Sequence, residues 1–230
     1  MTKVFHQLAL LGDVWVLWLL IIASVVSLGV ILERGWCFRK NRIDFAHFLE
    51  ELAGLLEKDD LAGARQAAKR SRGVEARVAL AGLEQFAKGP ASVEQAMASR
   101  LVLERAALER HLIILGSLGN NAPFVGLFGT VLGIIKAFND LAVSGQSGVG
   151  VVMVGISSAL IATAFGIFVA IPAVAANNAF HTRLKGVSAN AQSLIHRVQV
   201  YLRDETNRGS RSLVRAVQTV EHEEKEKVSI

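Results

Sequence analysis

Three hydroxyl side chains, Thr130, Ser158 and Thr163, lie inside long apolar segments that contain no Asp, Glu, Lys or Arg. A hydroxyl can donate a hydrogen bond to a carboxylate or accept one from a carboxylic acid, so it suits a site that changes its protonation state. If these segments are membrane helices, the standard helical rise places Thr130 about 9 Å inside Lys136. Ser158 then lies about 12 Å beyond Gly150, with Thr163 nearer the middle of the membrane. We therefore expect the three hydroxyls to line one polar track.

The alternative is that these hydroxyls only help the helices to pack. A serine or threonine side chain in a helix can bond back to a backbone carbonyl one turn earlier. Hydrogen bonds between membrane helices contribute no more than about 1–2 kcal/mol and are common. The spacing of the three residues agrees with both interpretations and leaves the choice between them open.

No charged side chain accompanies the hydroxyls. Residues 14–32, 111–135 and 141–182 contain no Asp, Glu, Lys or Arg. A buried ionisable residue is the usual mark of a proton relay in a membrane. Either nothing is conducted here, therefore, or a partner chain supplies the acid.

Signatures of soluble enzymes are missing from the chain. It contains no phosphate-binding loop, HExxH, CxxC or GxSxG motif, and its six histidines are scattered. We therefore expect no catalytic residue, no metal and no cofactor. The net charge of +5 comes with no basic–aromatic pattern of the kind that binds nucleic acid, so no nucleic-acid partner is expected.

The three charge-free segments are long enough to cross the roughly 30 Å hydrocarbon core of a bilayer. They predict an all-α integral membrane protein with transmembrane helices at 14–36, 111–138 and 151–178. The first could instead be a signal peptide, but its apolar part is longer than the usual length of about 7–15 residues. Abundant glycine and few aromatic residues also favour helices packed in a lipid bilayer.

Basic residues indicate the orientation of the spans, because positively charged flanks stay in the cytoplasm. Residues 1–13 and the loop 139–150 are therefore expected to face outward, whereas 37–110 and 179–230 are cytoplasmic. The basic residues beside the spans are Arg34, Arg39, Lys40, Arg42, Arg100, Arg105, Arg110, Arg183, Lys185 and Arg197.

The cytoplasmic segments are predicted to form long helices. Apolar residues recur at helical spacing over 45–56, and Asp60 is a typical N-cap for a short helix that follows it. Ser92 and Gln95 form a capping box, and no helix breaker follows them. We therefore expect one helix to run from Ser92 straight into the second span, and the third span to continue into a C-terminal helix.

Small residues form one face of the second span and one face of the third. A helix face without side chains lets another helix approach closely, as in GxxxG packing. Pro123 and Pro172 are expected to kink these two helices, because proline lacks the backbone N–H. The small residues are Gly126, Gly129 and Gly133, followed by Gly155, Ala159, Ala162, Gly166 and Ala170.

Two motifs carry a resemblance to a known family. Residues 122–134 read APFVGLFGTVLGI, and residues 159–174 read ALIATAFGIFVAIPAV. Together with the three spans and the length of the chain, they resemble the paired signature of the MotA/TolQ/ExbB proton-channel family, most closely its TolQ/ExbB branch.

The resemblance implies a homopentamer in the bacterial inner membrane, with a pore lined by the second and third spans. It implies an ExbD/TolR-like single-span partner dimer inside that pore, which carries a transmembrane Asp, and a TonB/TolA-like protein beyond it. Family threonines that face the aspartate match Thr130 and Thr163. The function implied is that of a stator-like proton-channel subunit, which converts proton motive force into mechanical work on the cell envelope. TonB-dependent import, Tol-Pal and gliding systems are examples.

One residue departs from the family pattern. Proteins of this branch carry a glutamate just before the ALIAT run, where this chain has Ser158. A hydroxyl can hold water there but cannot titrate. A non-conducting membrane scaffold remains the alternative function. A small-solute transporter is disfavoured, because nothing in the spans would bind a charged substrate and no inverted repeat is evident.

Overall fold

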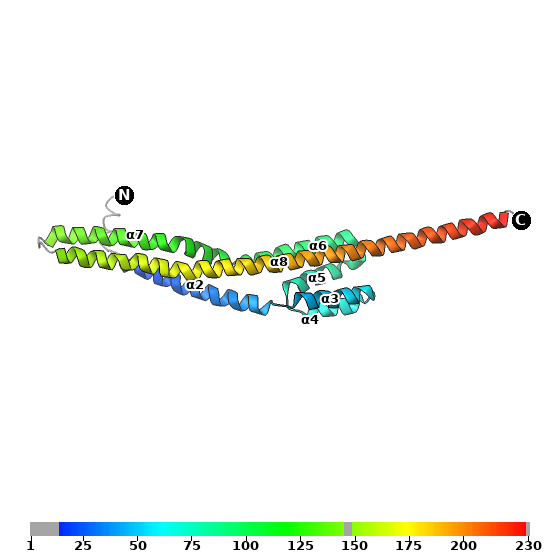
Figure 1. Ribbon diagram of the computed structural model, residues 1–230, viewed down its shortest axis with the longest axis horizontal. Coiled ribbons are helices and arrows are strands. Elements are labelled where there is room, and N and C mark those ends of the chain that lie inside the picture. Colours follow the sequence, from blue (N-terminus) through cyan, green and yellow to red (C-terminus); the bar gives the residue numbers. More distant parts are fainter. Residues whose placement is uncertain (1–13, 145–148, 229–230) are drawn as a thin grey trace. The chain divides into compact units, whose positions relative to one another are not determined.

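The computed structural model describes residues 14–144 and 149–228, and side chains are described as far as residue 203 except at 143–149 and 151. The described residues form helices without any strand, which confirms the all-α prediction (Figure 1). The helices are α2 (Val14–Lys40), α3 (Phe45–Glu57), α4 (Leu61–Arg70), α5 (Val74–Glu84), the 3-10 helix η1 (Phe86–Lys88), α6 (Pro90–Glu109), α7 (Leu112–Ser144) and α8 (Val149–Val228).

The chain divides into two compact units. The first, which we call the span unit, comprises residues 1–39 and 108–184. The second, which we call the polar unit, comprises residues 40–107 and 185–230. Helix α8 contributes its first part to the span unit and its second part to the polar unit.

Three helices are long and apolar enough to cross a membrane, as predicted. These are α2, α7 and the first part of α8. Their apolar stretches lie within Val14–Glu57, Leu112–Ala142 and Val152–Arg203, respectively. Each also exposes large apolar side chains. Examples are Trp18, Val25, Phe124, Leu127, Leu160 and Phe168. Such faces are stable against lipid or another apolar helix but not against water.

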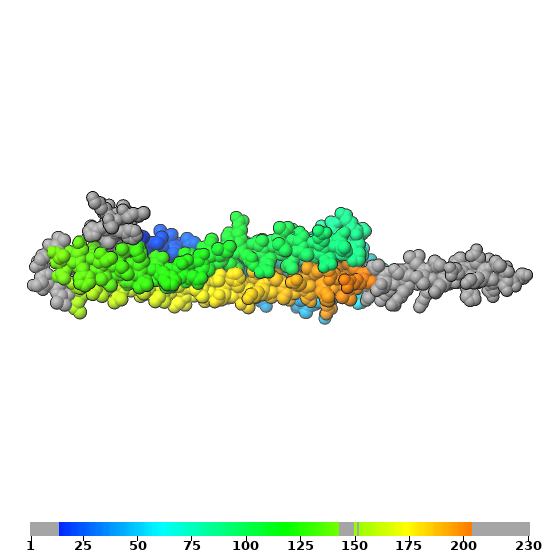
Figure 2. Space-filling view, turned by 90° about the horizontal axis from the view of Figure 1, so that it is seen from above, coloured from blue at the N-terminus to red at the C-terminus, as the bar shows by residue number. Residues whose placement is uncertain are grey.

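In the span unit, the three membrane helices share one core. Buried side chains from α2, α7 and α8 pack together there: Val16, Leu20, Ala122, Leu132, Val169 and Ala170. Aromatic contacts extend this packing, since the rings of Trp15 and Phe128 lie edge to face at 6.1 Å and those of Phe38 and Phe180 stack at 5.4 Å. Helices α7 and α8 lie side by side along the span unit in both views (Figures 1 and 2).

In the polar unit, short helices are stopped by side-chain caps. Asp60 accepts a hydrogen bond from the backbone N–H of Gly63 at 2.8 Å, which confirms the N-cap predicted at the start of α4. Asp44 caps α3 in the same way through His47 N–H. The apolar faces of these helices meet α6 and α8 in a second core that includes Leu52, Leu56, Ala64, Val78, Met97, Leu194 and Val198.

The prediction of one unbroken helix from Ser92 into the second span is wrong, because a turn at residues 110–111 separates α6 from α7. Helix α6 begins earlier, at Pro90, because Gly89 adopts a φ of 91° and proline suits the first helical position. It ends at Glu109, and α7 begins at Leu112 after a turn. The Leu108 carbonyl at this turn accepts a hydrogen bond from the Arg34 side chain at 3.3 Å, so a long-range contact takes part in ending the helix.

The predicted outer loop 139–150 is shorter than expected. Helix α7 continues to Ser144 and α8 begins at Val149, so only residues 145–148 of that loop lie outside the described residues. Residues 1–13, predicted to lie outside the cytoplasm, also fall outside the described part. At the other end, α8 extends to Val228.

Candidate functional site

The backbones of α7 and α8 touch where Gly126 meets Gly166. A Cβ atom on Gly126 would lie 2.7 Å from the Ala162 carbonyl oxygen and 3.0 Å from the Cα of Thr163. A Cβ atom on Gly166 would lie 2.6 Å from the Ala122 carbonyl oxygen. Both distances are too short for any side chain, so glycine is required on each side of this crossing.

The close approach extends along both helices. A Cβ atom on Gly129 would meet the Ala162 Cβ at 2.7 Å and Val16 of α2 at 3.1 Å, and one on Gly155 would meet the Ala137 Cβ at 2.4 Å. The small residues Ala159, Ala162 and Ala170 are buried in the same contact, and Gly133 is buried nearby. The two small-residue faces therefore face each other within one chain.

Both prolines lie inside helices rather than at their ends. Helix α7 continues through Pro123, and α8 continues through Pro172. Beside Pro123, the Asn121 side chain donates a hydrogen bond to the Ser117 carbonyl at 2.9 Å. This bond satisfies the Asn121 side chain within α7, whereas the carbonyl that lacks a helical donor because of Pro123 is that of Gly119, four residues before the proline.

Thr130 lies against the core of the span unit and is only 7 % exposed. Its hydroxyl donates a 2.6 Å hydrogen bond to the Leu127 carbonyl of the same helix. This geometry is the one expected of a hydroxyl that bonds back to its own helix. Because the hydroxyl oxygen keeps lone pairs, it can still accept a hydrogen bond from another group.

Thr163 differs from Thr130 in a decisive respect. Its hydroxyl oxygen is buried and has no hydrogen-bond partner among the described residues. A buried hydroxyl without a partner costs about 1–3 kcal/mol. Thr163 lies at the glycine crossing, since its Cα is 3.0 Å from the Cβ position of Gly126. The hydroxyl oxygen is covered by this chain itself, so a polar group of another molecule can reach it only where the packing of α7 against α8 opens.

Ser158 is exposed, unlike the two threonines. It lines a hollow of about 430 Å³ at the end of the span unit where α7 meets α8. The other residues that line this hollow are Gly133, Lys136, Ala137, Asp140, Gly150, Val154 and Gly155. Thr130 and Thr163 are not among them, so the structure does not bring the three hydroxyls into one hollow of a single chain.

At the opposite end of the span unit, α2 is joined to the turn between α6 and α7. Glu33 pairs with Arg34 and also contacts the Nδ1 atom of His111 at 2.6 Å. Arg34 is only 6 % exposed and donates to the Leu108 carbonyl. This cluster was not predicted from the sequence, although Glu33 and Arg34 directly follow the first apolar segment.

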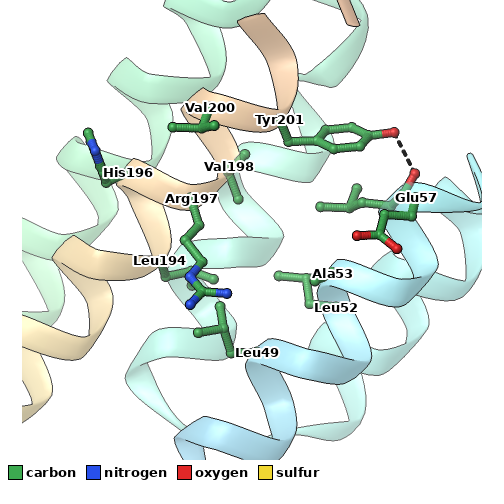
Figure 3. A pocket seen from close by; sticks show the side chains of 11 residues that line it. Leu49, Leu52, Ala53, Glu57, Leu194, His196, Arg197, Val198, Val200 and Tyr201 are labelled. Carbon is green, nitrogen blue, oxygen red and sulfur yellow. Dashed lines mark hydrogen bonds between the residues drawn. The ribbon is translucent and has the colours of Figure 1, made fainter. Parts of the chain in front are cut away.

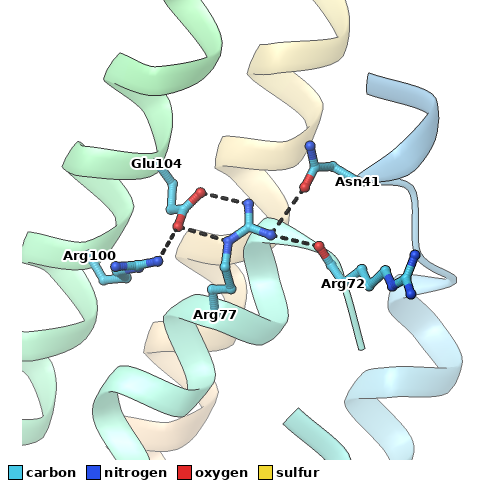
Figure 4. Close-up of polar contacts among 5 residues, drawn as sticks. All are labelled: Asn41, Arg72, Arg77, Arg100 and Glu104. Carbon is cyan, nitrogen blue, oxygen red and sulfur yellow. Dashed lines mark hydrogen bonds and ion pairs between the residues drawn. The ribbon is translucent and has the colours of Figure 1, made fainter. Parts of the chain in front are cut away.

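The polar unit contains a network of ion pairs around Glu104 (Figure 4). Arg77 donates to both carboxylate oxygens, at 2.8 and 2.6 Å, and Arg100 binds the same carboxylate at 2.6 Å. Burial alone would raise the pKa of Glu104, but the hydrogen bonds and charges of Arg77 and Arg100 outweigh it and lower that pKa. This carboxylate is thus held ionised.

A groove of about 360 Å³ lies between α3 and α8 in the polar unit (Figure 3). Leucines and valines line most of it, and Glu57, Arg197 and Tyr201 contribute polar atoms. The Tyr201 hydroxyl donates to the Leu56 carbonyl at 2.5 Å and so holds α8 to the end of α3. No group of three or more potential metal ligands occurs among the residues that the structure describes.

Comparison with known proteins identifies the relatives of this chain. Residues 70–193 match the model of the MotA/TolQ/ExbB proton channel family. The Tol-Pal system protein TolQ of Pseudomonas aeruginosa is 37% identical over 178 residues, which cover 71% of this chain and 76% of that protein. The biopolymer transport protein ExbB of Neisseria gonorrhoeae is 44% identical over 88 residues, 38% of this chain and 40% of that protein.

Proposed function

Because the chain belongs to the MotA/TolQ/ExbB proton channel family and is an inner-membrane protein, we propose that it is the channel-wall subunit of a proton-driven motor. In this proposal five copies form a ring around a partner dimer of the ExbD/TolR kind. Each partner chain crosses the membrane once and carries an aspartate. Its protonation and release drive mechanical work on the cell envelope through a TonB/TolA-like protein.

The observation that carries this proposal is the state of the Thr163 hydroxyl. It is buried, it has no partner in the described part of the chain, and residues 111–135 and 141–182 of the two helices around it contain no Asp, Glu, Lys or Arg. A hydroxyl can donate to a carboxylate and accept from a carboxylic acid, so it binds an aspartate in either protonation state. In this proposal Thr163 is the contact for the partner's aspartate once the local packing that covers its oxygen opens, and Thr130 supports it as an acceptor from the neighbouring helix.

Ser158 and Lys136 belong to the entrance of the pathway. The hollow they line carries three polar side chains, Lys136, Asp140 and Ser158, and the exposed Ser158 hydroxyl can hold water there. Because this chain has Ser158 where the family has a glutamate, protons pass this position through bound water, and the side chain itself does not gain or lose a proton. Residues 1–13 and the end of the span unit that holds this hollow face the periplasm, and the polar unit faces the cytoplasm.

The energy available is sufficient for small mechanical steps. One elementary charge that crosses the membrane supplies about 2.3 kcal/mol for each 100 mV of potential. A neutral wall is useful in such a device, because a fixed charge in the wall would bind the ionised aspartate too tightly or repel it. The glycine crossing of α7 and α8 keeps that wall rigid while the partner moves.

Substitution of Thr163 tests the proposal. The full-length chain, purified together with its single-span acidic subunit, is reconstituted in liposomes, and proton uptake is followed with a pH-sensitive dye. Thr163→Val should assemble normally and lose proton flux by about tenfold or more, a change of about 1.4 kcal/mol in the barrier. Thr163→Ser, which keeps the hydroxyl, should retain most of the flux.

Thr182→Val is the matched control. Its hydroxyl donates to the Asn178 carbonyl at 3.0 Å within the same helix, so its loss should leave the flux unchanged. Equal flux from wild type and Thr163→Val would refute the assignment of Thr163.

A non-conducting scaffold remains the second candidate, because the Thr130 hydroxyl bonds back to its own helix. Under that function neither Thr130→Ala nor Thr163→Val changes proton uptake, and both change only the thermal stability of the complex. Failure to co-purify any single-span acidic subunit would favour the scaffold over the motor.

A further inference from the structure

Glu75 places a carboxyl group in the interior of the polar unit. It lies in the first turn of α5 and is only 3 % exposed. Its neighbours along the helix, Val74, Ala76 and Val78, are buried apolar residues. An ionised carboxylate in such a place is strongly destabilising unless a cation or several hydrogen bonds compensate it.

The two oxygens of Glu75 have different surroundings. Oε1 accepts a hydrogen bond from Nδ2 of Asn190 at 3.3 Å, a contact that joins α5 to α8 across 115 residues of sequence. Oε2 is buried and has no partner in the part of the chain that the structure describes. One long hydrogen bond is poor compensation for a full negative charge, whereas a carboxylic acid with its proton on Oε2 is neutral.

The cation closest along the chain is committed elsewhere. Arg77, two residues after Glu75, forms the bidentate pair with Glu104. Its remaining guanidinium nitrogen donates to the Asn41 side chain at 3.1 Å and to the Arg72 carbonyl at 2.7 Å (Figure 4). Arg77 therefore attracts the Glu75 carboxyl only from a distance and does not form an ion pair with it.

Among the residues whose side chains the structure describes, the other elements of the polar unit do not supply a counter-ion either. From α4, Arg65 donates to the Leu83 carbonyl at 2.9 Å. From α6, Arg100 binds Glu104. From α8, the side chain that meets this carboxyl is the neutral Asn190. Burial accordingly raises the pKa of the Glu75 carboxyl, against smaller opposing effects of its backbone hydrogen bond, the amide of Asn190 and the charge of Arg77.

We propose that Glu75 is a proton-binding residue of the polar unit that keeps its proton to a higher pH than an exposed glutamate does, and that its carboxylic acid and the Asn190 amide form a latch between α5 and α8. This inference goes beyond the proton pathway in the span unit, because it requires neither a partner chain nor conduction. The site takes a single proton from the surrounding water and releases it to the water when the pH rises.

Release of that proton has a structural consequence. The carboxylate left behind is charged, buried and without a counter-ion, so the contact between α5 and α8 loosens as the pH rises. Asn190 lies on α8, the helix that also carries Thr163 in the span unit. The latch therefore acts on a helix that both units share.

Infrared spectroscopy of the full-length protein in lipid nanodiscs tests the proposal. A carboxylic acid has a C=O stretching band that an ionised carboxylate lacks. As the pH is raised from about 4, the bands of exposed glutamates should disappear first, and wild type should keep one band to a higher pH that Glu75→Gln lacks. Glu84→Gln, on the same helix but exposed, is the matched control and should keep this late band. Disappearance of every carboxylic-acid band of wild type together with those of exposed glutamates, or persistence of the late band in Glu75→Gln, would overturn the proposal.

A second variant keeps the test valid if Glu75→Gln fails to fold. Asn190→Leu leaves the carboxyl in place and removes the amide that stabilises its charged form, so the band should persist to a higher pH than in wild type. Hydrogen exchange of 74–84 and 185–200, corrected for the intrinsic effect of pH, should rise with pH in wild type. An unchanged titration of the band in Asn190→Leu would exclude the latch.

Discussion

The span unit and the polar unit bury polar groups in opposite ways. In the span unit, the buried polar side chains near the α7–α8 crossing are hydroxyls, and the helices meet through bare backbone at Gly126 and Gly166. In the polar unit, two carboxyls are buried, and one of them is held by two arginines. Lipid offers no water to solvate a charge that becomes unpaired, so residues 14–32, 111–135 and 141–182 contain no Asp, Glu, Lys or Arg.

The polar unit itself contains both solutions to the burial of an acid. Glu104 is paired and its pKa is lowered, whereas Glu75 is not paired and its pKa is raised. The two differ in the position of guanidinium groups and not in residue type. A buried glutamate therefore stays ionised where cations are packed against it and binds a proton where they are not.

The largest effect is expected at the backbone contact of the span unit. Gly166→Val places a side chain 2.6 Å from the Ala122 carbonyl oxygen, so the two helices must separate. We expect a loss of about 3 kcal/mol or more, measured as thermal stability in detergent. Gly29→Val is the control, because nothing lies within 4 Å of its Cβ position. Equal stability of the two variants would show that the α7–α8 crossing is not rigid.

A smaller effect is expected from the paired carboxylate. Glu104→Gln leaves Arg77 and Arg100 without their anion and should destabilise the protein by about 1–3 kcal/mol near neutral pH. Because the folded-state pKa of Glu104 is lowered, its contribution is present above the ordinary value of 4.5 and is lost as the pH falls through the folded-state pKa. Unfolding curves of wild type and variant should therefore converge in acid. A constant difference across that range would contradict the pairing.

The unpaired carboxyl should show the opposite sign. The folded-state pKa of Glu75 is raised, so wild-type stability should fall as the pH rises from its ordinary value of 4.5 to the folded-state pKa. Glu75→Gln should remove this decrease and be more stable than wild type above that range, by about 1 kcal/mol. Urea unfolding of the purified protein at several pH values measures both. A variant less stable than wild type at high pH would rule out the unpaired charge.

The smallest effect concerns a neutral contact in the polar unit. Tyr201→Phe removes the hydrogen bond to the Leu56 carbonyl at the end of α3 and keeps the aromatic packing. The expected loss is about 0.5–1.5 kcal/mol, without pH dependence. Proteolysis near residues 57–60 should become faster, and its rate gives a local measurement. A pH-dependent loss would indicate that the nearby Asp59 carboxyl, 3.3 Å from the hydroxyl, takes a larger part in this contact.

Much of the fold follows from local patterns in the sequence. The three spans are recognisable because a charge-free apolar segment of sufficient length has few stable alternatives to a membrane helix. The N-cap at Asp60 is recognisable because the side chain bonds its own backbone three residues later. The small-residue faces of α7 and α8 are also visible in the sequence, since helical periodicity brings residues such as Gly126 and Gly129 to one side.

Other features depend on residues that are far apart in the chain. The turn between α6 and α7 involves Arg34, 74 residues before the carbonyl that it binds. The Ser92 capping box was outweighed by the conformation of Gly89 and Pro90 just before it. A local sequence pattern does not show which contact or backbone conformation forms at these two places, because the outcome depends on the packing of the whole unit.

The amino-acid sequence is sufficient to show that this chain is a membrane protein of three apolar helices, with hydroxyls but no Asp, Glu, Lys or Arg in residues 14–32, 111–135 and 141–182. These properties depend on composition and helical periodicity, which are local. The pairing of Glu104, and the lack of an ion pair for Glu75 among the described residues, depend instead on the tertiary structure. The energy of a buried polar group depends on the partners within hydrogen-bond distance, and folding alone brings those partners together.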